Sequence, residues 1–301
     1  MYTVEKLNLK RLTKKQSKIY HALLHPAWES PYFPLGLLDP KKTSQIALAA
    51  LENLKPIALL VASEQTGEPW QIHSFYIEPE HRDKGLEEKL LKKLEKELPI
   101  QAKMVVFNYK FSDSPYFDPH LEKLGWEGKR PVMADCFYDN IRDFHPPWFE
   151  KPLILPPEFE IFFWKELKPE ESELIKNWAN TRQIPPIIDP FQGDGSFEPT
   201  TSLGLRYNGE IVGWMVNRLL PPSTLLYLCF YMRHDLQSKG YSMQLLKRSI
   251  QLQQMGPIKS AYFFVNFLHS RLNWLEAVEK HLAPVATKFT LYLQAWKTLK
   301  N

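Results

Sequence analysis

The feature that most constrains this fold is an internal repeat at a fixed distance along the chain. The residues Lys84, Gly85 and Leu90-Leu91-Lys92 recur as Lys239, Gly240 and Leu245-Leu246-Lys247, always 155 positions later. Both copies stand between an apolar stretch and an amphipathic helix pattern. Structural repeats of solenoid proteins are only about 20–50 residues long. The spacing therefore predicts a duplicated domain.

A proline-rich segment lies between the two copies. Prolines occupy positions 146, 147, 152, 156 and 157. Because proline lacks a backbone donor and fixes φ, we expect a semi-rigid connector here. The predicted organisation is a degenerate first domain at 1–145, a linker at 146–157 and a second domain at 158–301.

Both halves show the same order of predicted elements. The first half has expected helices at 14–24, 86–98 and 118–124 and strands at 45–51, 56–62, 71–77, 101–109 and 132–138. The second has helices at 169–182, 242–253 and 272–281 and strands at 158–164, 202–207, 210–217, 225–232, 260–266 and 288–294. Thr66-Gly67 and Asn208-Gly209 are turn signals. Such hairpins with interspersed helices predict an α+β fold, two tandem domains that each have a mostly antiparallel central sheet flanked by helices.

Composition excludes several classes of protein. The net charge of +4 is mild and lacks the concentrated basic stripe of a nucleic-acid binder. The longest apolar run, 225–232, is too short for a membrane span, and the first six residues hold no secretory core. Two cysteines form no disulfide framework, and His21 and His25 lack a third ligand, so we expect no metal. We expect a cytoplasmic monomer or homodimer.

The junction after the apolar run 225–232 is the expected ligand site. A strand, a glycine loop and a helix follow one another directly, and the first backbone N–H groups of a helix have no partner within it. These groups and the helix dipole suit a pyrophosphate. Gly240 permits close approach, Ser242 is small, and Lys239 adds positive charge.

The residues at this junction resemble a known signature. Gln237-x-x-Gly240-x-Ser242 resembles the Q/R-x-x-G-x-G/A motif of the GNAT N-acetyltransferase superfamily, and Arg82-x-x-Gly85-x-Glu87 resembles a degraded copy. Leu121-Glu122-Lys123-Leu124-Gly125-Trp126 is similar to the family's late Y-E-K-L-G-F segment. The order of elements is similar to the family fold over nearly the whole chain.

The resemblance implies an acyl-CoA, acetyl-CoA first, as donor substrate and a small-molecule or peptide amine as acceptor. It places the pantetheine arm along the backbone of Phe230, Tyr231 and Met232, where neighbouring strands splay. It places the pyrophosphate on Gln237, Ser238, Lys239, Gly240, Tyr241, Ser242 and Met243. Glu87 sets a bulky carboxylate at the corresponding place, so we expect the first half not to bind CoA.

The acid and base of the reaction are not evident. The glutamate base of some family members falls at Gln71 and Leu226, and the tyrosine acid at Leu121 and near Glu279. If strand alternation holds, Gln71, His73, Phe75 and Ile77 share one face, as do Leu226, Leu228, Phe230 and Met232. Candidate catalytic residues are His73, Asn266 and His269. In the loop 183–195, Asp189 or Asp194 offers a carboxylate for an ammonium group.

Two functions remain open. The intact loop at residues 237–242 favours an acyl-CoA-dependent N-acyltransferase with its donor in the second domain. The missing acid and base favour a non-catalytic CoA-binding or scaffold protein of the same fold.

Overall fold

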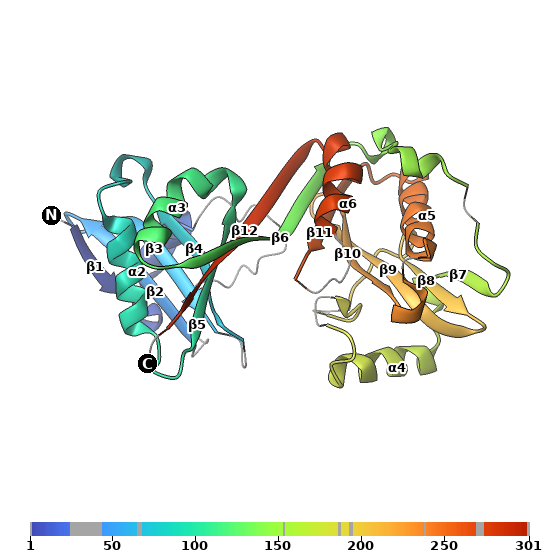
Figure 1. The fold of residues 1–301 in the computed structure, drawn as a ribbon, viewed down its shortest axis with the longest axis horizontal. Helices are drawn as coiled ribbons and strands as arrows, with labels where there is room; N and C mark the ends of the chain where they lie inside the picture. The colour runs from blue at the N-terminus through green and yellow to red at the C-terminus, as the bar shows by residue number, and fades with distance from the viewer. Residues whose placement is uncertain are drawn as a thin grey trace. The chain divides into compact units, whose positions relative to one another are not determined.

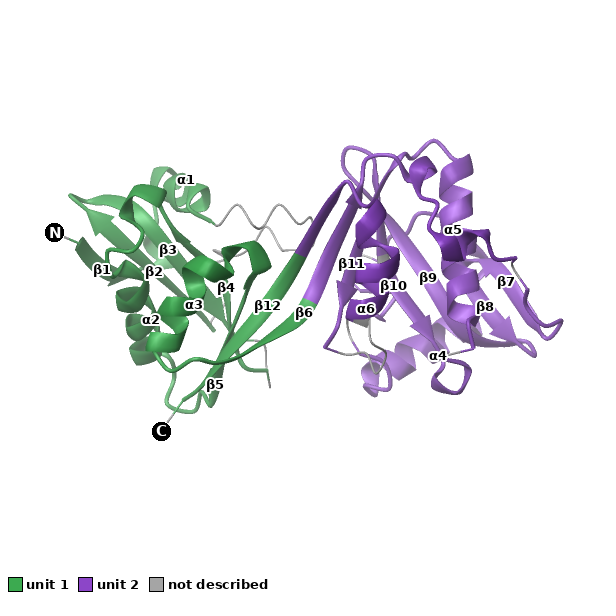
Figure 2. Cartoon of the chain, turned by 45° about the horizontal axis from the view of Figure 1, so that its top comes forward, with its two compact units in different colours: residues 1–132, 291–301 green, residues 133–290 purple. Residues whose placement is uncertain are grey.

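The computed structural model describes residues 2–24, 44–64, 68–152, 154–185, 188–192, 195–237, 239–268 and 274–299. Contacts between Cα atoms divide the chain into two compact units (Figure 2). The first unit comprises residues 1–132 and 291–301, and the second comprises residues 133–290. Figures 1 and 2 together label the elements used below.

The first half of the chain contributes six strands and three helices among the described residues. The strands are β1 (Tyr2–Lys6), β2 (Gln45–Glu52), β3 (Lys55–Ser63), β4 (Trp70–Ile77), β5 (Met104–Lys110) and β6 (Glu127–Tyr138). The helices are α1 (Lys14–Ala22), α2 (Leu86–Glu97) and α3 (Ser114–Lys123).

The second half has the same composition of elements in the part that the structure describes. Its strands are β7 (Phe159–Phe163), β8 (Leu203–Tyr207), β9 (Glu210–Leu220), β10 (Thr224–Met232), β11 (Ser260–Asn266) and β12 (Lys288–Thr298). Its helices are α4 (Pro169–Asn180), α5 (Tyr241–Met255) and α6 (Trp274–His281).

The predicted α+β fold is confirmed in both halves. Strand β1 was not predicted from the sequence. Helix α3 begins four residues earlier than expected because Pro115 is well placed in a first helical turn. Asn208 and Gly209 both have positive φ and connect β8 to β9, as the hairpin signal predicts. Thr66 and Gly67 lie outside the described residues.

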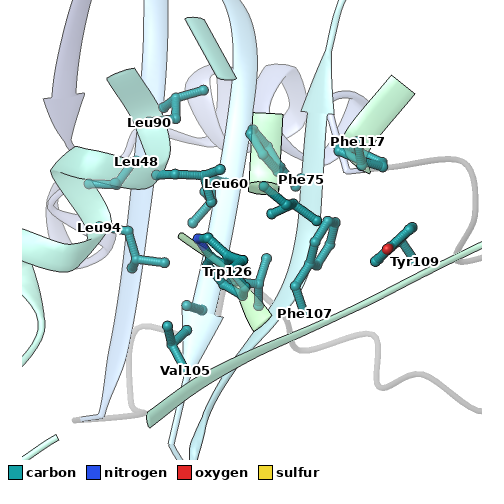
Figure 3. Close-up of a cluster of buried hydrophobic side chains, with 14 of the residues drawn as sticks. Leu48, Leu60, Phe75, Leu90, Leu94, Val105, Phe107, Tyr109, Phe117 and Trp126 are labelled. Carbon is teal, nitrogen blue, oxygen red and sulfur yellow. The ribbon is translucent and has the colours of Figure 1, made fainter. Parts of the chain in front are cut away.

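The core of the first unit lies mainly between its sheet and α2 with α3. Figure 3 shows Leu90 and Leu94 of α2 and Phe117 of α3 against the strands. These helix positions are buried because the leucines of α2 recur every three or four residues on one face. On the opposite face of the sheet, Tyr20 of α1 and Leu23, the residue that follows the helix, pack on β2 and β3.

The core of the second unit replaces part of this apolar packing with a polar network. The side-chain amide of Asn217 donates to Oγ1 of Thr201 at 3.0 Å and to Oγ of Ser249 at 2.8 Å, and the hydroxyl of Tyr227 donates to Gln253 at 2.9 Å. The residues 155 positions earlier are all in the aliphatic core of the first unit: Ile46, Ala62, Ile72, Leu94 and Leu98. The two copies therefore share a backbone but not a core.

Each unit contains a strand from the other half of the chain: β12 in the first unit and β6 in the second. The strand order is β1-β2-β3-β4-β5-β12 in one series and β6-β11-β10-β9-β8-β7 in the other. Residues 292–298 of β12 pair with β5 in the first unit, and residues 133–138 of β6 pair with β11 in the second. The last strand of each half is thus exchanged.

This exchange explains why contacts group the chain differently from the predicted limits 1–145, 146–157 and 158–301. Those limits stay a prediction about the duplicated segments. The proline-rich residues lie within the second unit, where Phe149 is buried and Nζ of Lys247 donates to the carbonyl oxygen of Lys151.

Candidate active site at the end of strand β10

The central strand of the second unit carries a β-bulge. The antiparallel register of β10 with β9 shifts between Tyr227 and Cys229, which leaves Leu228 as the extra residue. The parallel register with β11 covers Thr224–Tyr227 and stops where the bulge begins. The first unit has the same bulge at His73, 155 residues earlier, and β4 pairs with β5 only over Trp70–Ile72. In both units the parallel pairing of the central strand therefore ends at the bulge.

The bulge overturns one prediction about side-chain faces. Trp70, Ile72, Phe75 and Ile77 all belong to one core cluster, whereas Tyr76 packs against the core on the opposite face. An extra residue in one strand reverses the alternation beyond it. The expectation that Phe75 and Ile77 share the face of Gln71 and His73 is therefore wrong.

The same correction applies to β10. Tyr227 bonds to Gln253 of α5, but Tyr231 contacts Trp178 of α4, so two odd-numbered residues face opposite sides. Phe230 and Met232 accordingly do not share a face with Leu226. Tyr231 takes that place, which the sequence pattern did not show.

A tight loop connects β10 to α5. A 3-10 turn at His234–Leu236 follows the strand, and Nε2 of Gln237 donates to the carbonyl oxygen of Met232 at 2.8 Å. Gly240 caps α5 with a φ of +82°, a conformation that suits glycine. Helix α5 has no side-chain cap and no acidic residue in its first turn. Its first N–H groups and its dipole are therefore not neutralised by a carboxylate of that turn.

Among the predicted phosphate-binding residues, Lys239 and Gly240 are exposed, and Gln237, Tyr241, Ser242 and Met243 are half-buried. Of the three strand residues, Phe230 and Tyr231 are half-buried and Met232 is buried. Ser238 lies outside the described residues. The predicted residues that are described thus line one continuous strand, loop and helix start.

The first unit has the same loop but fills it with its own carboxylate. Nε of Arg82 donates to the carbonyl oxygen of Ile77 at 3.2 Å, and Gly85 has a φ of +77°. The side chain of Glu87 is 0% exposed, and its Oε1 accepts from the backbone N–H of Asp83 at 3.0 Å and from the hydroxyl of Tyr116 at 2.5 Å. Burial and this hydrogen bond raise the pKa of Tyr116 far above its ordinary value. A loop amide is therefore already paired with a carboxylate oxygen.

A stack of aromatic rings and a carboxylate lie on the α4 side of β10. The ring of Tyr231 stacks on that of Trp214 with centroids 4.3 Å apart. Nε1 of Trp214 donates to the carbonyl oxygen of Ile188 at 3.1 Å. This hydrogen bond holds the loop that carries Asp189 against β9. Burial, and then the charge of Asp189, raise the pKa of the Cys229 thiol. The charge of Asp189 is therefore felt at Cys229, just past the bulge of β10. Asp194 lies outside the described residues.

Comparison with known proteins gives the family. The model of the acetyltransferase (GNAT) family matches residues 10–107. A tandem GNAT protein from the clavulanic acid biosynthesis pathway has a TM-score of 0.61 and 11% identity, over 100% of this chain and 99% of that chain. Residues 10–107 therefore match the GNAT family, and the chain as a whole has the fold of a tandem GNAT protein.

Other solved structures show the same fold. A GCN5-related N-acetyltransferase from Sphaerobacter thermophilus has a TM-score of 0.57 and 15% identity, over 85% of this chain and 81% of that chain. The glucosamine N-acetyltransferase region of a fungal multi-domain GH3 β-N-acetylglucosaminidase has a TM-score of 0.63 and 12% identity, over 99% of this chain and 38% of that chain. No match to a curated protein was found.

The match to the GNAT family model supports acyl-CoA-dependent N-acyltransferase activity, with an amine as acceptor, at the level of the family. In the described part of the chain, every helix is too short or too polar to cross a membrane.

The structure does not bring the candidate catalytic residues of the GNAT reaction together in one unit. His73 lies in the first unit, where its Nε2 and Oγ of Ser63 are 2.7 Å apart in a hydrogen bond. Asn266 ends β11 in the second unit, and its Oδ1 accepts from the backbone N–H of Leu268 at 2.8 Å. His269 lies outside the described residues. At the family's acid position, Leu121 is buried and Glu279 is exposed.

Proposed function

We propose that the protein transfers an acyl group, acetyl first, from acyl-CoA to an amine, and that the donor binds in the second unit. The observation that carries this proposal is the contrast between two duplicated helix starts. Helix α5 begins without an acidic residue, whereas α2 begins with Glu87 and Glu88, and the first of these accepts a loop N–H. A diphosphate needs such N–H groups unpaired and no buried carboxylate beside them.

The residues of the second unit have separate roles in this proposal. The loop at 237–243 holds the pyrophosphate, and the pantetheine arm lies along β10 beyond its bulge, where the parallel register with β11 has ended. Asp189 offers a carboxylate that attracts the ammonium form of the acceptor to the α4 side of the strand.

The chemistry itself is an aminolysis of a thioester. The neutral amine nitrogen attacks the carbonyl carbon, a C–N bond forms, and the C–S bond breaks. The proton lost by nitrogen passes to a base or to solvent, and the thiolate of CoA leaves and is protonated. His73, Asn266 and His269 stay the candidate proton-transfer residues. Because correct placement alone contributes a large part of such a rate, a strong side-chain base is not required.

A matched pair of substitutions tests the assignment of the donor. Gly240→Glu adds a carboxylate at the start of α5, and Gly85→Glu adds the same group at the start of α2. Both glycines have positive φ and open space around an added Cβ, so the backbone strain is the same. We expect Gly240→Glu to abolish the calorimetric signal of acetyl-CoA binding and Gly85→Glu to leave it almost unchanged.

Two further variants separate charge from strain. Gly240→Ala carries the strain without the charge, so it should weaken binding much less than Gly240→Glu. Ser242→Glu carries the charge at a normal helical residue, copies what Glu87 does in the first unit, and should abolish binding. Equal losses from Gly240→Glu and Gly85→Glu would contradict the proposal.

One observation favours a CoA-binding scaffold as a second candidate. Gln71 and Leu226 stand where other family members have a glutamate base, and the acid positions carry no tyrosine. Release of free thiol from acetyl-CoA with a panel of amines separates the two functions. Binding of CoA without thiol release from any amine would favour the scaffold.

A further inference from the structure

A three-residue cluster in the first unit has no role in the proposed reaction. Asp83, Glu87 and His120 each place one potential ligand atom within 4.8 Å of the others. Asp83 and Glu87 belong to the loop and first turn of α2, and His120 comes from α3. The cluster therefore joins the filled loop to a second helix.

The carboxylate of Glu87 is only half satisfied. Its Oε1 accepts two hydrogen bonds, from the backbone N–H of Asp83 and the hydroxyl of Tyr116. Its Oε2 is buried and has no hydrogen-bond partner in the described part of the chain. A buried carboxylate oxygen without a partner is costly, so such a group requires a proton or a cation.

The other two members of the cluster indicate a cation. Nε2 of His120 lies 3.3 Å from Oδ1 of Asp83, which is long for a charge-assisted hydrogen bond of about 2.7–2.9 Å. Ligand atoms at about 2.0–2.1 Å from a tetrahedral zinc ion are about 3.3–3.4 Å apart. The side chain of His120 is 15% exposed and that of Asp83 is 76% exposed, so the cluster lies between the interior and solvent.

The groups around the cluster support its orientation. The hydroxyl of Tyr116 holds Oε1 of Glu87 from one side, the kind of outer contact that fixes a ligating carboxylate. In the second unit, serines 238 and 242 stand at the positions of Asp83 and Glu87. The cluster is therefore absent from the unit in which we place the donor.

We propose that Asp83, Glu87 and His120 bind one divalent transition-metal ion, Zn²⁺ first, with water as the remaining ligand. From the two cysteines and the pair His21 and His25 we expected no metal. The three residues of this cluster are separated along the chain and form no spacing motif that would have revealed them. The ion links the loop at 82–87 to α3. The same duplicated loop then holds a cation in the first unit and an anion in the second. This proposal does not depend on the proposed function.

Calorimetric titration of the chelator-treated full chain with Zn²⁺ tests the site. We expect one equivalent to bind, and Co²⁺ in its place to show the visible absorption of a tetrahedral or five-coordinate ion. Glu87→Gln, Asp83→Asn and His120→Gln should each weaken Zn²⁺ binding at least about 10-fold, because even loss of an outer contact to a ligand costs about 10–100-fold.

The control is a second cluster, Glu78, Glu80 and His81, which has the same ligand types in the same unit. His81→Gln should leave the affinity unchanged. Asp83→Asn keeps the test valid if the buried variants fail to fold, because Asp83 is mostly exposed. Absence of Zn²⁺ binding, or unchanged binding in Asp83→Asn and His120→Gln, would overturn the proposal and assign a proton to Glu87.

Discussion

At the scale of single residues, one carboxylate separates the two halves. Glu87 and Ser242 occupy equivalent positions 155 residues apart, after left-handed glycines with φ of +77° and +82°. The backbone of the loop is the same, but the glutamate bonds to a loop N–H and is fully buried. The two loops therefore differ in a side chain rather than in the course of the chain, and our proposal assigns their different ligands to this side chain.

A second single-residue feature governs stability in acid. Glu171 at the start of α4 is buried, and its carboxylate accepts from Nε of Arg206 at 2.6 Å and from Nη2 at 2.9 Å. Burial alone would raise the pKa of Glu171, but the hydrogen bonds from Arg206 and from the backbone of Lys168 outweigh it, and the pKa lies below its usual range. The pair connects α4 to β8.

The sign of the pH dependence follows from this lowered pKa. The ion pair stabilises the fold above the unfolded pKa of about 4.3, and the stabilisation is lost as the pH falls through the folded value. We expect Glu171→Gln to lower the free energy of unfolding at neutral pH by about 3 kcal/mol, since it leaves buried Arg206 with only the exposed, more distant Glu160 as a charged partner. Urea unfolding at several pH values measures this. In Glu171→Gln, the free energy of unfolding should fall less below pH 4 than it does in the unsubstituted protein.

The control for this prediction is an exposed pair on the same helix. Lys176 and Glu173 are 2.7 Å apart but largely in solvent, so Glu173→Gln should change stability by less than about 1 kcal/mol. Equal effects of the two substitutions would refute the role given to Glu171.

At the scale of elements, the attachment of β12 depends on a glycine in β6. Gly128 has a φ of +65°, and a Cβ there would lie 1.8 Å from an atom of the Trp296 ring. The guanidinium of Arg130 lies over the same ring and donates to Oε1 of Gln294 at 2.8 Å. The two strands are therefore joined by close packing and by a polar contact.

Gly128→Ala should destabilise the first unit by about 2–4 kcal/mol, because overpacking adds to the strain of a left-handed residue. Gly125→Ala is the matched control: its φ is +71°, but no atom lies within 4 Å of the added Cβ. Gly125→Ala should lower the free energy of unfolding by only about 1–2 kcal/mol. Chemical denaturation compares them, and identical losses would show that Trp296 does not pack as described.

At the scale of the whole molecule, the exchange of last strands makes each unit depend on a distant part of the chain. Residues 104–110 of β5 pair with residues 292–298 of β12, although nearly 190 positions separate them. A unit without its exchanged strand exposes the edge of β5 or β11. Neither half is expected to be stable alone.

Deleting residues 288–301 tests this dependence. We expect the amides of β5 to lose protection from hydrogen exchange, because β12 no longer pairs with them. Deletion of residues 2–6, which form the edge strand β1, should affect β2 and leave β5 protected. Full protection of β5 in the shortened chain would contradict the pairing.

The amino-acid sequence by itself determined the duplication, the order of the strands and helices after β1, and the glycine loop at the start of α5. These features are local: hydrophobic periodicity, turn residues and a repeat with fixed spacing act within a few residues. The hairpin at Asn208-Gly209 was predictable for this reason.

Only the tertiary structure decided which residues meet. The bulges at His73 and Leu228 reverse the alternation of faces, and this depends on pairing with a neighbouring strand. The contacts of Glu87 with Tyr116, and of its cluster with His120, join α2 to α3. The exchange of β6 and β12 likewise depends on hydrogen bonds between distant segments, which no local pattern specifies. Local propensity places elements along a chain, whereas pairing and packing between them place side chains in a site.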